Sequence, residues 1–302
     1  MSTPQARQVK LRNVMIVVLI GLLLAIWLIW SQWAALRGDP AAPSDPGVAS
    51  DETGAAAAGE RESPTAVAGA AEQRWTELLG RPPAWPDDVA STTDCESAEA
   101  DLLRVCADLD SRDSIAAAGV PGGVCGLLRE VADELVARPP VLTSELKSYQ
   151  AIVSNVYHLF RVLGRERIAL LRQIVGEDPQ LAEPAAMAIH RWLSSRERCT
   201  RSGRTAIRLP ALYDYAGFLF ETMGGQALLR RRTPDTEALV SFYALLILDR
   251  ADRQGHNPHG VDPRQEIERT RALLAKGPWV LGERYDSMLE EMATRWEQRT
   301  AE

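Results

Sequence analysis

Residues 235 to 253 read DTEALVSFYALLILDRADR, and the spacing of their apolar side chains decides the fold class. Large apolar residues recur there at steps of three and four, the period that places side chains on one face of an α-helix. The same period returns at 146–163, and residues 73–302 show no sustained alternation of the kind that marks β-strands. The chain is therefore expected to be all-α. The residues that set the pattern are Leu239, Phe242, Tyr243, Leu246 and Ile247.

Proline and glycine positions place the ends of further helices. Asp262 before Pro263 is typical of a helix start, and Gly277 with Pro278 is typical of a helix end. No repeat with a period near about 34 or 40 residues is present, so we expect an irregular bundle of about nine or ten helices. The expected helices are 68–79, 96–109, 123–137, 144–163, 165–175, 179–195, 210–223, 235–253, 263–276 and 282–298.

A long apolar run covers residues 14–36, VMIVVLIGLLLAIWLIWSQWAAL. At about 1.5 Å per residue, a helix of this length crosses a hydrocarbon core of about 30 Å. Arg7, Lys10 and Arg12 precede the run and acidic residues follow it, which predicts a cytoplasmic N-terminus. A cleaved signal peptide and a buried core helix are the alternatives, but the run exceeds a usual signal core of about 7 to 15 residues.

The chain is accordingly expected to contain four regions. Residues 1–13 form a cytoplasmic N-terminal stub, and residues 14–36 form a transmembrane signal-anchor. Residues 37–72 form a linker rich in Ala, Pro and acidic residues, which we expect to be disordered because it has too little apolar surface to offset the entropy of ordering. Residues 73–302 form an extracytoplasmic all-helical domain. The expected location is a bacterial inner membrane, with this domain in the periplasm.

The chain has four cysteines, Cys95, Cys106, Cys125 and Cys199, all on the predicted outer side. An even number of cysteines in an oxidising compartment is compatible with two disulfides. If Cys106 ends one helix and Cys125 begins the next, a helical hairpin brings them together, and Cys95 would then pair with Cys199. Four buried free thiols are the alternative.

The net charge of the chain and the positions of its arginines indicate which classes of partner to expect. The formal net charge is -7 and the pI is about 5.3, which argues against nucleic acid as a partner. Arginines nevertheless cluster in two places, where they could bind an acidic protein, lipid headgroups or an anionic envelope polymer. A solvated face paired with neighbouring acids is the alternative. The candidate partner-binding residues are Arg191, Arg196, Arg198, Arg201, Arg204, Arg208, Arg230, Arg231 and Arg232.

The stretch LDRADRQGHNPHGVDP, residues 248–263, holds two of the four histidines. His256, His259 and Asp262 are residue types that bind zinc or another divalent ion. Their spacing matches neither a histidine pair on a helix face nor an EF-hand loop. A polar turn in which Asp262 caps the next helix is the alternative interpretation.

Residues 209–229, LPALYDYAGFLFETMGGQALL, carry five large side chains that spread around more than one helix face. Core packing is the default interpretation of such a pattern, and a groove for a partner is the alternative. The five side chains belong to Tyr213, Tyr215, Phe218, Phe220 and Met223.

No motif in the sequence specifies a reaction, so we expect a binding protein rather than an enzyme, with no cofactor. The prediction is a single-pass membrane protein whose helical domain acts as a scaffold or accessory subunit of an envelope assembly, with a protein or an anionic polymer as partner. Two alternatives remain open. One is a metal-assisted envelope hydrolase using His256 and His259. The other is a ligand sensor that acts through a membrane partner.

Overall fold

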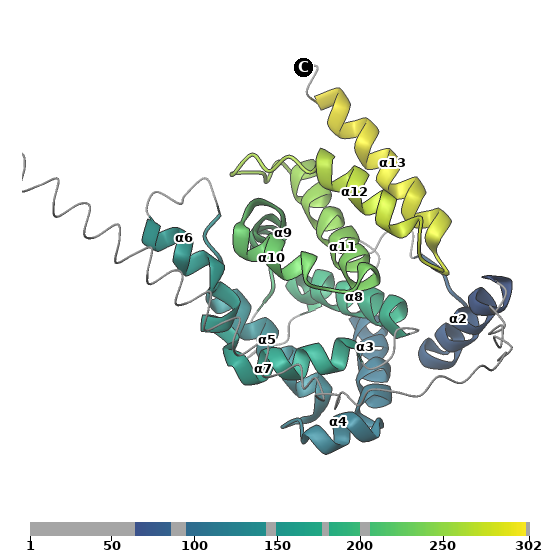
Figure 1. Cartoon of the computed structure of the whole chain (residues 1–302). Coiled ribbons are helices and arrows are strands. Elements are labelled where there is room, and N and C mark those ends of the chain that lie inside the picture. Colours follow the sequence, from purple (N-terminus) through teal and green to yellow (C-terminus); the bar gives the residue numbers. More distant parts are fainter. Residues whose placement is uncertain (1–63, 86–94, 143–148, 177–180, 200–205, 300–302) are drawn as a thin grey trace, which may run out of the picture. The chain divides into compact units, whose positions relative to one another are not determined.

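The computed structural model describes residues 64–85, 95–142, 149–176, 181–199 and 206–299 (Figure 1). These residues form helices and no strands, which confirms the predicted all-α class. The predicted anchor 14–36 lies outside this part of the chain, as do residues 37–63. Within the described part, no helix combines the length and the apolar character needed to span a membrane. The helices are α2 (Pro64–Leu79), α3 (Cys95–Asp110), α4 (Asp113–Ala118), α5 (Gly123–Ala137), α6 (Tyr149–Val156), α7 (His158–Gly176), α8 (Ala182–Cys199), α9 (Leu209–Glu221), α10 (Met223–Arg230), α11 (Pro234–Arg253), α12 (Arg264–Leu274) and α13 (Gly282–Arg299).

Helix α11 shows why the sequence signals were sufficient in this region. The Thr233 hydroxyl accepts a hydrogen bond from the Thr236 amide at 3.3 Å, and Pro234 occupies the first helical turn. Both features favour helix initiation, the first by satisfying an amide that lacks a partner within the helix. Acidic residues in the first turn and arginines in the last complement the helix dipole. Helix α11 packs against α8, α9, α10 and α12 near the centre of the fold (Figure 1).

Several helix boundaries differ from the sequence prediction. Helix α2 begins at Pro64, so residues 64–72 of the expected linker are helical. The short helix α4 was not predicted, because six residues are too few to show a period. The predicted helix over 144–163 is divided at Tyr157 into α6 and the first part of α7. The predicted helix over 165–175 forms the rest of α7, and Gly164 between them is a non-helical residue within α7.

Adjacent glycines are typical of turns, yet the pair at 224–225 lies within α10. The reason is a close approach between α9 and α10. A Cβ atom at Gly225 would stand 1.9 Å from the Phe218 carbonyl oxygen, so this contact requires glycine. The Thr222 hydroxyl accepts a hydrogen bond from the Gly225 amide at 3.0 Å and caps the helix. The pair therefore starts a helix here.

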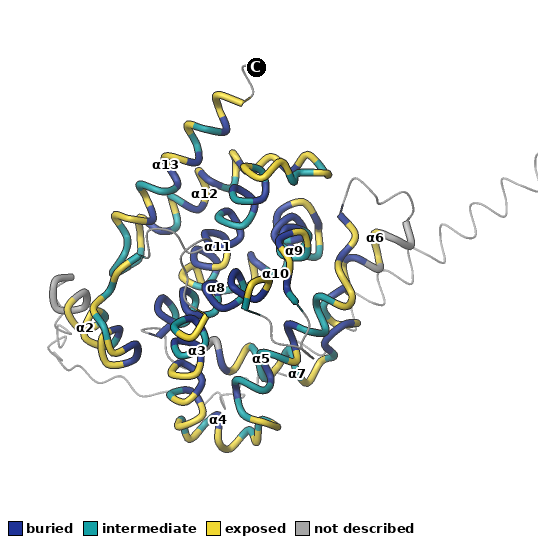
Figure 2. The backbone as a smooth tube through the Cα atoms, turned by 180° about the vertical axis from the view of Figure 1, so that it is seen from behind, coloured by how far each residue is buried: buried dark blue, intermediate teal, exposed yellow. Residues whose placement is uncertain are grey.

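The core runs between the helices as one connected cluster, with buried positions concentrated on α8, α9 and α11 (Figure 2). An aromatic group stands beside α11, where Trp85 stacks on Tyr243 with ring centroids 6.1 Å apart. Phe242 and Tyr285 extend this group, with ring centroids 4.4 Å apart. These contacts join the segment after α2 to helices α11 and α13, far apart in sequence.

Two disulfides join the cysteines in the predicted pairing. Cys95 and Cys199 connect the start of α3 to the end of α8, with an S–S distance of 2.07 Å. Cys106 and Cys125 connect α3 to α5 at 2.15 Å, across the predicted helical hairpin. Helix α3 is therefore bonded covalently to α5 and α8, two of the helices that it packs against.

Candidate ligand-binding cavity

A cavity of about 360 Å³ lies among α7, α8, α9 and α11. Each of the last three helices turns one face toward it, because its lining residues follow the helical step of three and four. Nearly all of these residues are apolar. The lining residues are Leu109 and Leu128; Leu171 and Ile174; Leu181, Ala182, Ala185, Ala186, Ile189, His190 and Leu193; Leu212, Tyr215, Ala216 and Leu219; and Thr236, Leu239, Val240, Tyr243, Ala244 and Ile247.

Small side chains on α8 create much of this space. Ala182, Ala185 and Ala186 lie on the cavity face, and each is only partly buried although the neighbouring helices are close. The next position round the helix, Met187, is fully buried against the core. A face of alanines opposite larger side chains on α9 and α11 leaves room that their own packing does not fill. The small side chains on this face of α8 are therefore one cause of the cavity.

His190 is the polar residue that stands out in the wall. Its exposed fraction is 9 %, and its ring packs on that of Tyr243 with centroids 4.9 Å apart. Burial, with a smaller contribution from the nearby positive charge of Arg250, lowers the pKa of His190 to about 3, so the imidazole is neutral at physiological pH. Within the described part of the chain, His190 makes no hydrogen bond. A neutral imidazole offers one donor and one acceptor, and His190 lines a largely apolar space.

Tyr215 lies on the opposite wall, and its hydroxyl is already engaged. It donates to the carbonyl oxygens of Leu135 at 3.0 Å and Arg138 at 3.1 Å, and it lies 3.0 Å from Nε2 of His158. Burial lowers the pKa of His158 to about 4, with smaller contributions from Arg161 and Arg138. Tyr215 and His158 thus hold α9 against α5 and α7, which keeps this wall in place.

The predicted arginine clusters divide in the structure. Arg191 and Arg196 are buried and join α8 to its neighbours. Arg191 forms an ion pair with Asp101 of α3, while Arg196 lies 3.4 Å from Asp133 of α5. These two arginines therefore do not belong to an exposed basic surface, and they tie helices together.

Most of the other predicted arginines that the structure describes are exposed, as a basic surface requires. Arg198, Arg208, Arg230 and Arg231 are exposed, whereas Arg201 and Arg204 lie outside the described residues. Arg232 is partly buried, and burial followed by the charge of Arg172 lowers its pKa. The exposed members remain candidates for binding an anionic partner.

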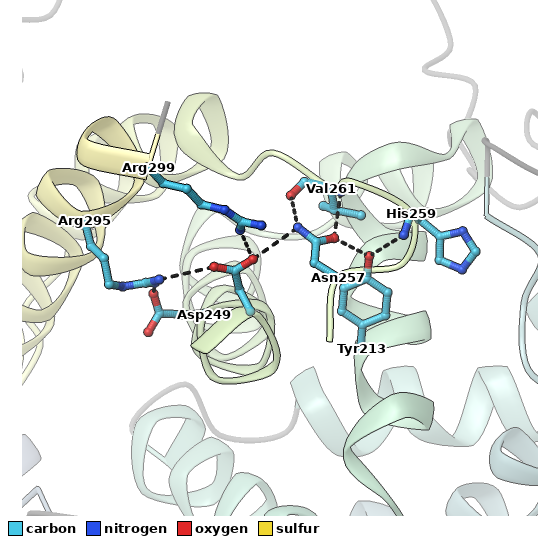
Figure 3. Close-up of polar contacts among 8 residues, drawn as sticks. Tyr213, Asp249, Asn257, His259, Val261, Arg295 and Arg299 are labelled. Atoms are coloured by element: carbon cyan, nitrogen blue, oxygen red, sulfur yellow. Dashed lines mark hydrogen bonds and ion pairs between the residues drawn. The ribbon is translucent and has the colours of Figure 1, made fainter. Parts of the chain in front are cut away.

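The histidine loop between α11 and α12 is held by Asn257 (Figure 3). The Asn257 side-chain oxygen accepts hydrogen bonds from the Tyr213 hydroxyl at 2.6 Å and the Val261 amide at 2.9 Å. The His256 and His259 rings both pack against the Tyr213 ring. Both histidine rings are therefore held in contact with the Tyr213 ring.

Acidic residues around this loop are paired with arginines. Asp262 binds Arg264, and its Oδ1 also accepts the Arg264 amide at 3.1 Å. Helix α12 begins at Arg264 with Pro263 at the N-cap position, one residue later than the predicted start. Asp249 pairs with Arg295, and Asp252 with Arg299, which ties α13 to α11 (Figure 3). Among the described residues, no group of three His, Cys, Asp or Glu is placed to hold a metal ion. The arrangement fits the alternative of a structured polar turn.

A second feature is an exposed apolar face, which we name the α6–α10 face. It is formed by α6, the start of α7 and the start of α10, which packs against α6. Gly224 lies so near the Asn155 carbonyl oxygen that a Cβ atom would be 2.7 Å from it. Met223 beside it is 71 % exposed. The members of the face are Ile152, Val153, Val156, Tyr157, Phe160 and Met223.

Of the five large side chains singled out in residues 209–229, only Tyr215 lines the cavity, together with the smaller Leu212, Ala216 and Leu219 of the same segment. Tyr213, Phe218 and Phe220 are buried in the core, which confirms the packing interpretation for these three. The other cavity residues were not identified from the sequence. The available signal was the spacing of alanines at 182, 185 and 186 opposite the large side chains of α11.

Comparisons with known proteins give no match: no family model, no curated protein and no solved structure is similar to this chain.

Proposed function

We propose that this chain is a single-pass membrane-anchored binding protein whose helical domain, outside the cytoplasmic membrane, holds a small apolar molecule in the cavity between α8, α9 and α11. The observation that carries the proposal is the cavity wall, which is apolar apart from His190, Tyr215, Thr236 and Tyr243. Concave sites lined mainly by apolar side chains with a few placed polar groups are typical of small-molecule binding.

The size of the cavity is that of a small-molecule site. Its volume of about 360 Å³ falls within the usual range of about 300–1,000 Å³ for ligand pockets.

The extracytoplasmic location is supported by the two disulfides, since such bonds persist mainly in oxidising compartments. It is supported also by the apolar run 14–36 with its basic N-terminal flank. In this proposal the cavity makes the ligand-sensor interpretation more specific: the domain would report the presence of an apolar molecule near the membrane.

Photolabelling tests the proposal on the full-length protein in native membranes. A dodecanol carrying a diazirine in its chain is added and irradiated, and labelled peptides are identified by mass spectrometry. We expect label on α8, α9 and α11, competed by unmodified dodecanol. Label distributed without preference over exposed surfaces would contradict the proposal.

A matched pair of variants controls this experiment. Ala186→Phe places a ring in the cavity and should remove the label from α8, α9 and α11. Ala117→Phe adds the same ring at an exposed position of α4 and should leave the labelling unchanged. Equal labelling of the two variants would show that the probe does not enter the cavity.

The α6–α10 face favours a second candidate function, the predicted scaffold. Exposed apolar patches on a soluble domain often mark contact surfaces. Crosslinking of the full-length protein in native membranes, followed by purification, should recover a stoichiometric partner that Phe160→Glu loses. Leu103→Glu, an exposed apolar residue on α3, is the control. If both variants keep the partner, this face is not its contact surface.

A further inference from the structure

The polar groups of the cavity wall indicate the chemical class of its ligand. Within the wall there is no Lys, Arg, Asp or Glu. Transfer of a carboxylate or phosphate into such surroundings is unfavourable, because the charge loses its hydration and finds no opposite charge. An anionic headgroup would therefore have to remain outside the cavity.

Two of the four polar wall residues are already engaged. The Tyr215 hydroxyl donates to the carbonyls of Leu135 and Arg138. The Thr236 hydroxyl lies 3.0 Å from the Thr233 hydroxyl at the start of α11. Neither group depends on a ligand to satisfy its hydrogen-bonding capacity.

Tyr243 and His190 form the remaining polar part of the wall. The Tyr243 hydroxyl is buried without a hydrogen-bond partner in the described part of the chain, and Tyr285 and Glu183 lie near it. His190 is more than nine-tenths buried, lines the cavity and has no hydrogen bond within the described residues. The His190 ring and the Tyr243 hydroxyl are therefore the two polar groups of the wall without a hydrogen-bond partner among the described residues, and a ligand in the cavity can supply one to His190.

The charge state of His190 restricts that partner. Because burial lowers its pKa to about 3, the ring is neutral and cannot balance an anion. A neutral ring can accept a hydrogen bond from a hydroxyl through one nitrogen, or donate one to a carbonyl through the other.

Resting on the proposed binding in this cavity, we infer that the ligand is an uncharged chain lipid whose hydroxyl or carbonyl group hydrogen-bonds to His190. A long-chain alcohol is the simplest member of this class. The hydrocarbon part contacts the alanines of α8 and the apolar side chains of α9 and α11, and the polar group lies beside the Tyr243 ring.

Competition against the diazirine dodecanol tests this inference on the full-length protein in nanodiscs. The competitors are dodecane, 1-dodecanol and dodecanoate, which share a chain length and differ in the polar group. We expect dodecanol to compete at least tenfold better than dodecane, and dodecanoate to compete no better than dodecane.

The three competitors partition unequally into the bilayer, so each one is compared between the wild-type protein and a variant. The partitioning of a given competitor is the same for both proteins, and the comparison therefore reports binding. With His190→Phe, dodecanol and dodecane should compete about equally well. His190→Gln, which keeps a neutral donor and acceptor, should retain part of the preference. His256→Phe makes the same change outside the cavity and should behave as the wild type.

The outcomes separate the two proposals. If no probe labels α8, α9 or α11, the proposed cavity binding itself fails. If the probe labels these helices but dodecanoate competes as well as dodecanol, or His190→Phe keeps the full preference, then cavity binding stands and the inferred ligand class is overturned.

Discussion

The two faces of helix α8 differ in what they do for the protein. The face toward α3 carries Met187, Ala188 and Arg191, all buried, with Arg191 in an ion pair to Asp101. The face toward α9 and α11 carries Ala182, Ala185 and Ala186, which border open space. One helix thus combines a packed, charge-paired and disulfide-bonded side with a side left unfilled. The contrast separates a face that joins α8 to α3 from a face that lines the proposed binding cavity.

The largest expected effect concerns the disulfide that holds the packed side. Cys95 and Cys199 are 104 residues apart, whereas Cys106 and Cys125 are 19 apart. Loop-closure entropy predicts a loss of about 4.7 kcal/mol for the longer loop and about 3 kcal/mol for the shorter one. Paired Cys→Ala variants, unfolded by urea, should show this order. A larger loss of unfolding free energy on removing the Cys106–Cys125 disulfide would contradict the expected order.

The buried charge of α3 comes next. Asp101 is 1 % exposed and interacts with Arg81, Arg104 and Arg191. Asp101→Asn would leave Arg191 buried without its counter-charge, and we expect a loss of about 3–5 kcal/mol in the free energy of unfolding. Asp286→Asn, which breaks an exposed pair with Arg271, should cost about 1 kcal/mol or less. Equal losses from the two variants would show that the buried pair does not stabilise the packed side.

Mild acid should act on the cavity side. Burial lowers the pKa values of His158 and His190 to about 4 and about 3. Between pH 6.5 and pH 5 the unfolded chain therefore binds protons that the folded chain excludes, and stability falls as pH falls. The loss is about 2 kcal/mol for each such histidine. His158→Gln should reduce this pH dependence by about half in urea unfolding at the two pH values, and an unchanged slope would contradict the assignment.

The smallest effect comes from one substitution made on both faces of α8. Ala188→Phe inserts a ring where the side chain is fully buried, and overpacking should cost about 1–3 kcal/mol. Ala186→Phe inserts it into the cavity and should change stability by less than about 1 kcal/mol. Thermal unfolding of the two variants compares the faces directly. If Ala186→Phe destabilises as much as Ala188→Phe, the cavity face is packed like the core.

Local signals predicted much of this fold from the sequence. Helix α11 and helix α5 have nearly their expected bounds, because each combines a clear apolar period with capping or glycine signals. The cysteine pairing followed from the hairpin of α3 and α5. The α9–α10 junction did not follow from local signals, because glycine is required there by a contact between two helices and not by a turn.

The cavity and the buried arginines depend on which helices meet, which no local pattern records. Arg191 and Arg196 resemble surface residues until Asp101 and Asp133 are placed beside them. The alanines of α8 likewise resemble ordinary core residues until α9 and α11 are seen to leave space in front of them. Residue type predicted the elements, and the arrangement of helices determined the site.

The most direct test of apolar binding in the α8–α9–α11 cavity is to identify what the protein carries from its own cell. Full-length wild type and Ala186→Phe are purified in parallel from native membranes, and their organic extracts are compared by mass spectrometry. Surrounding membrane lipids are common to both samples. We predict an uncharged apolar compound at about one equivalent in the wild type that is absent from the variant. Identical extracts would contradict the proposed function.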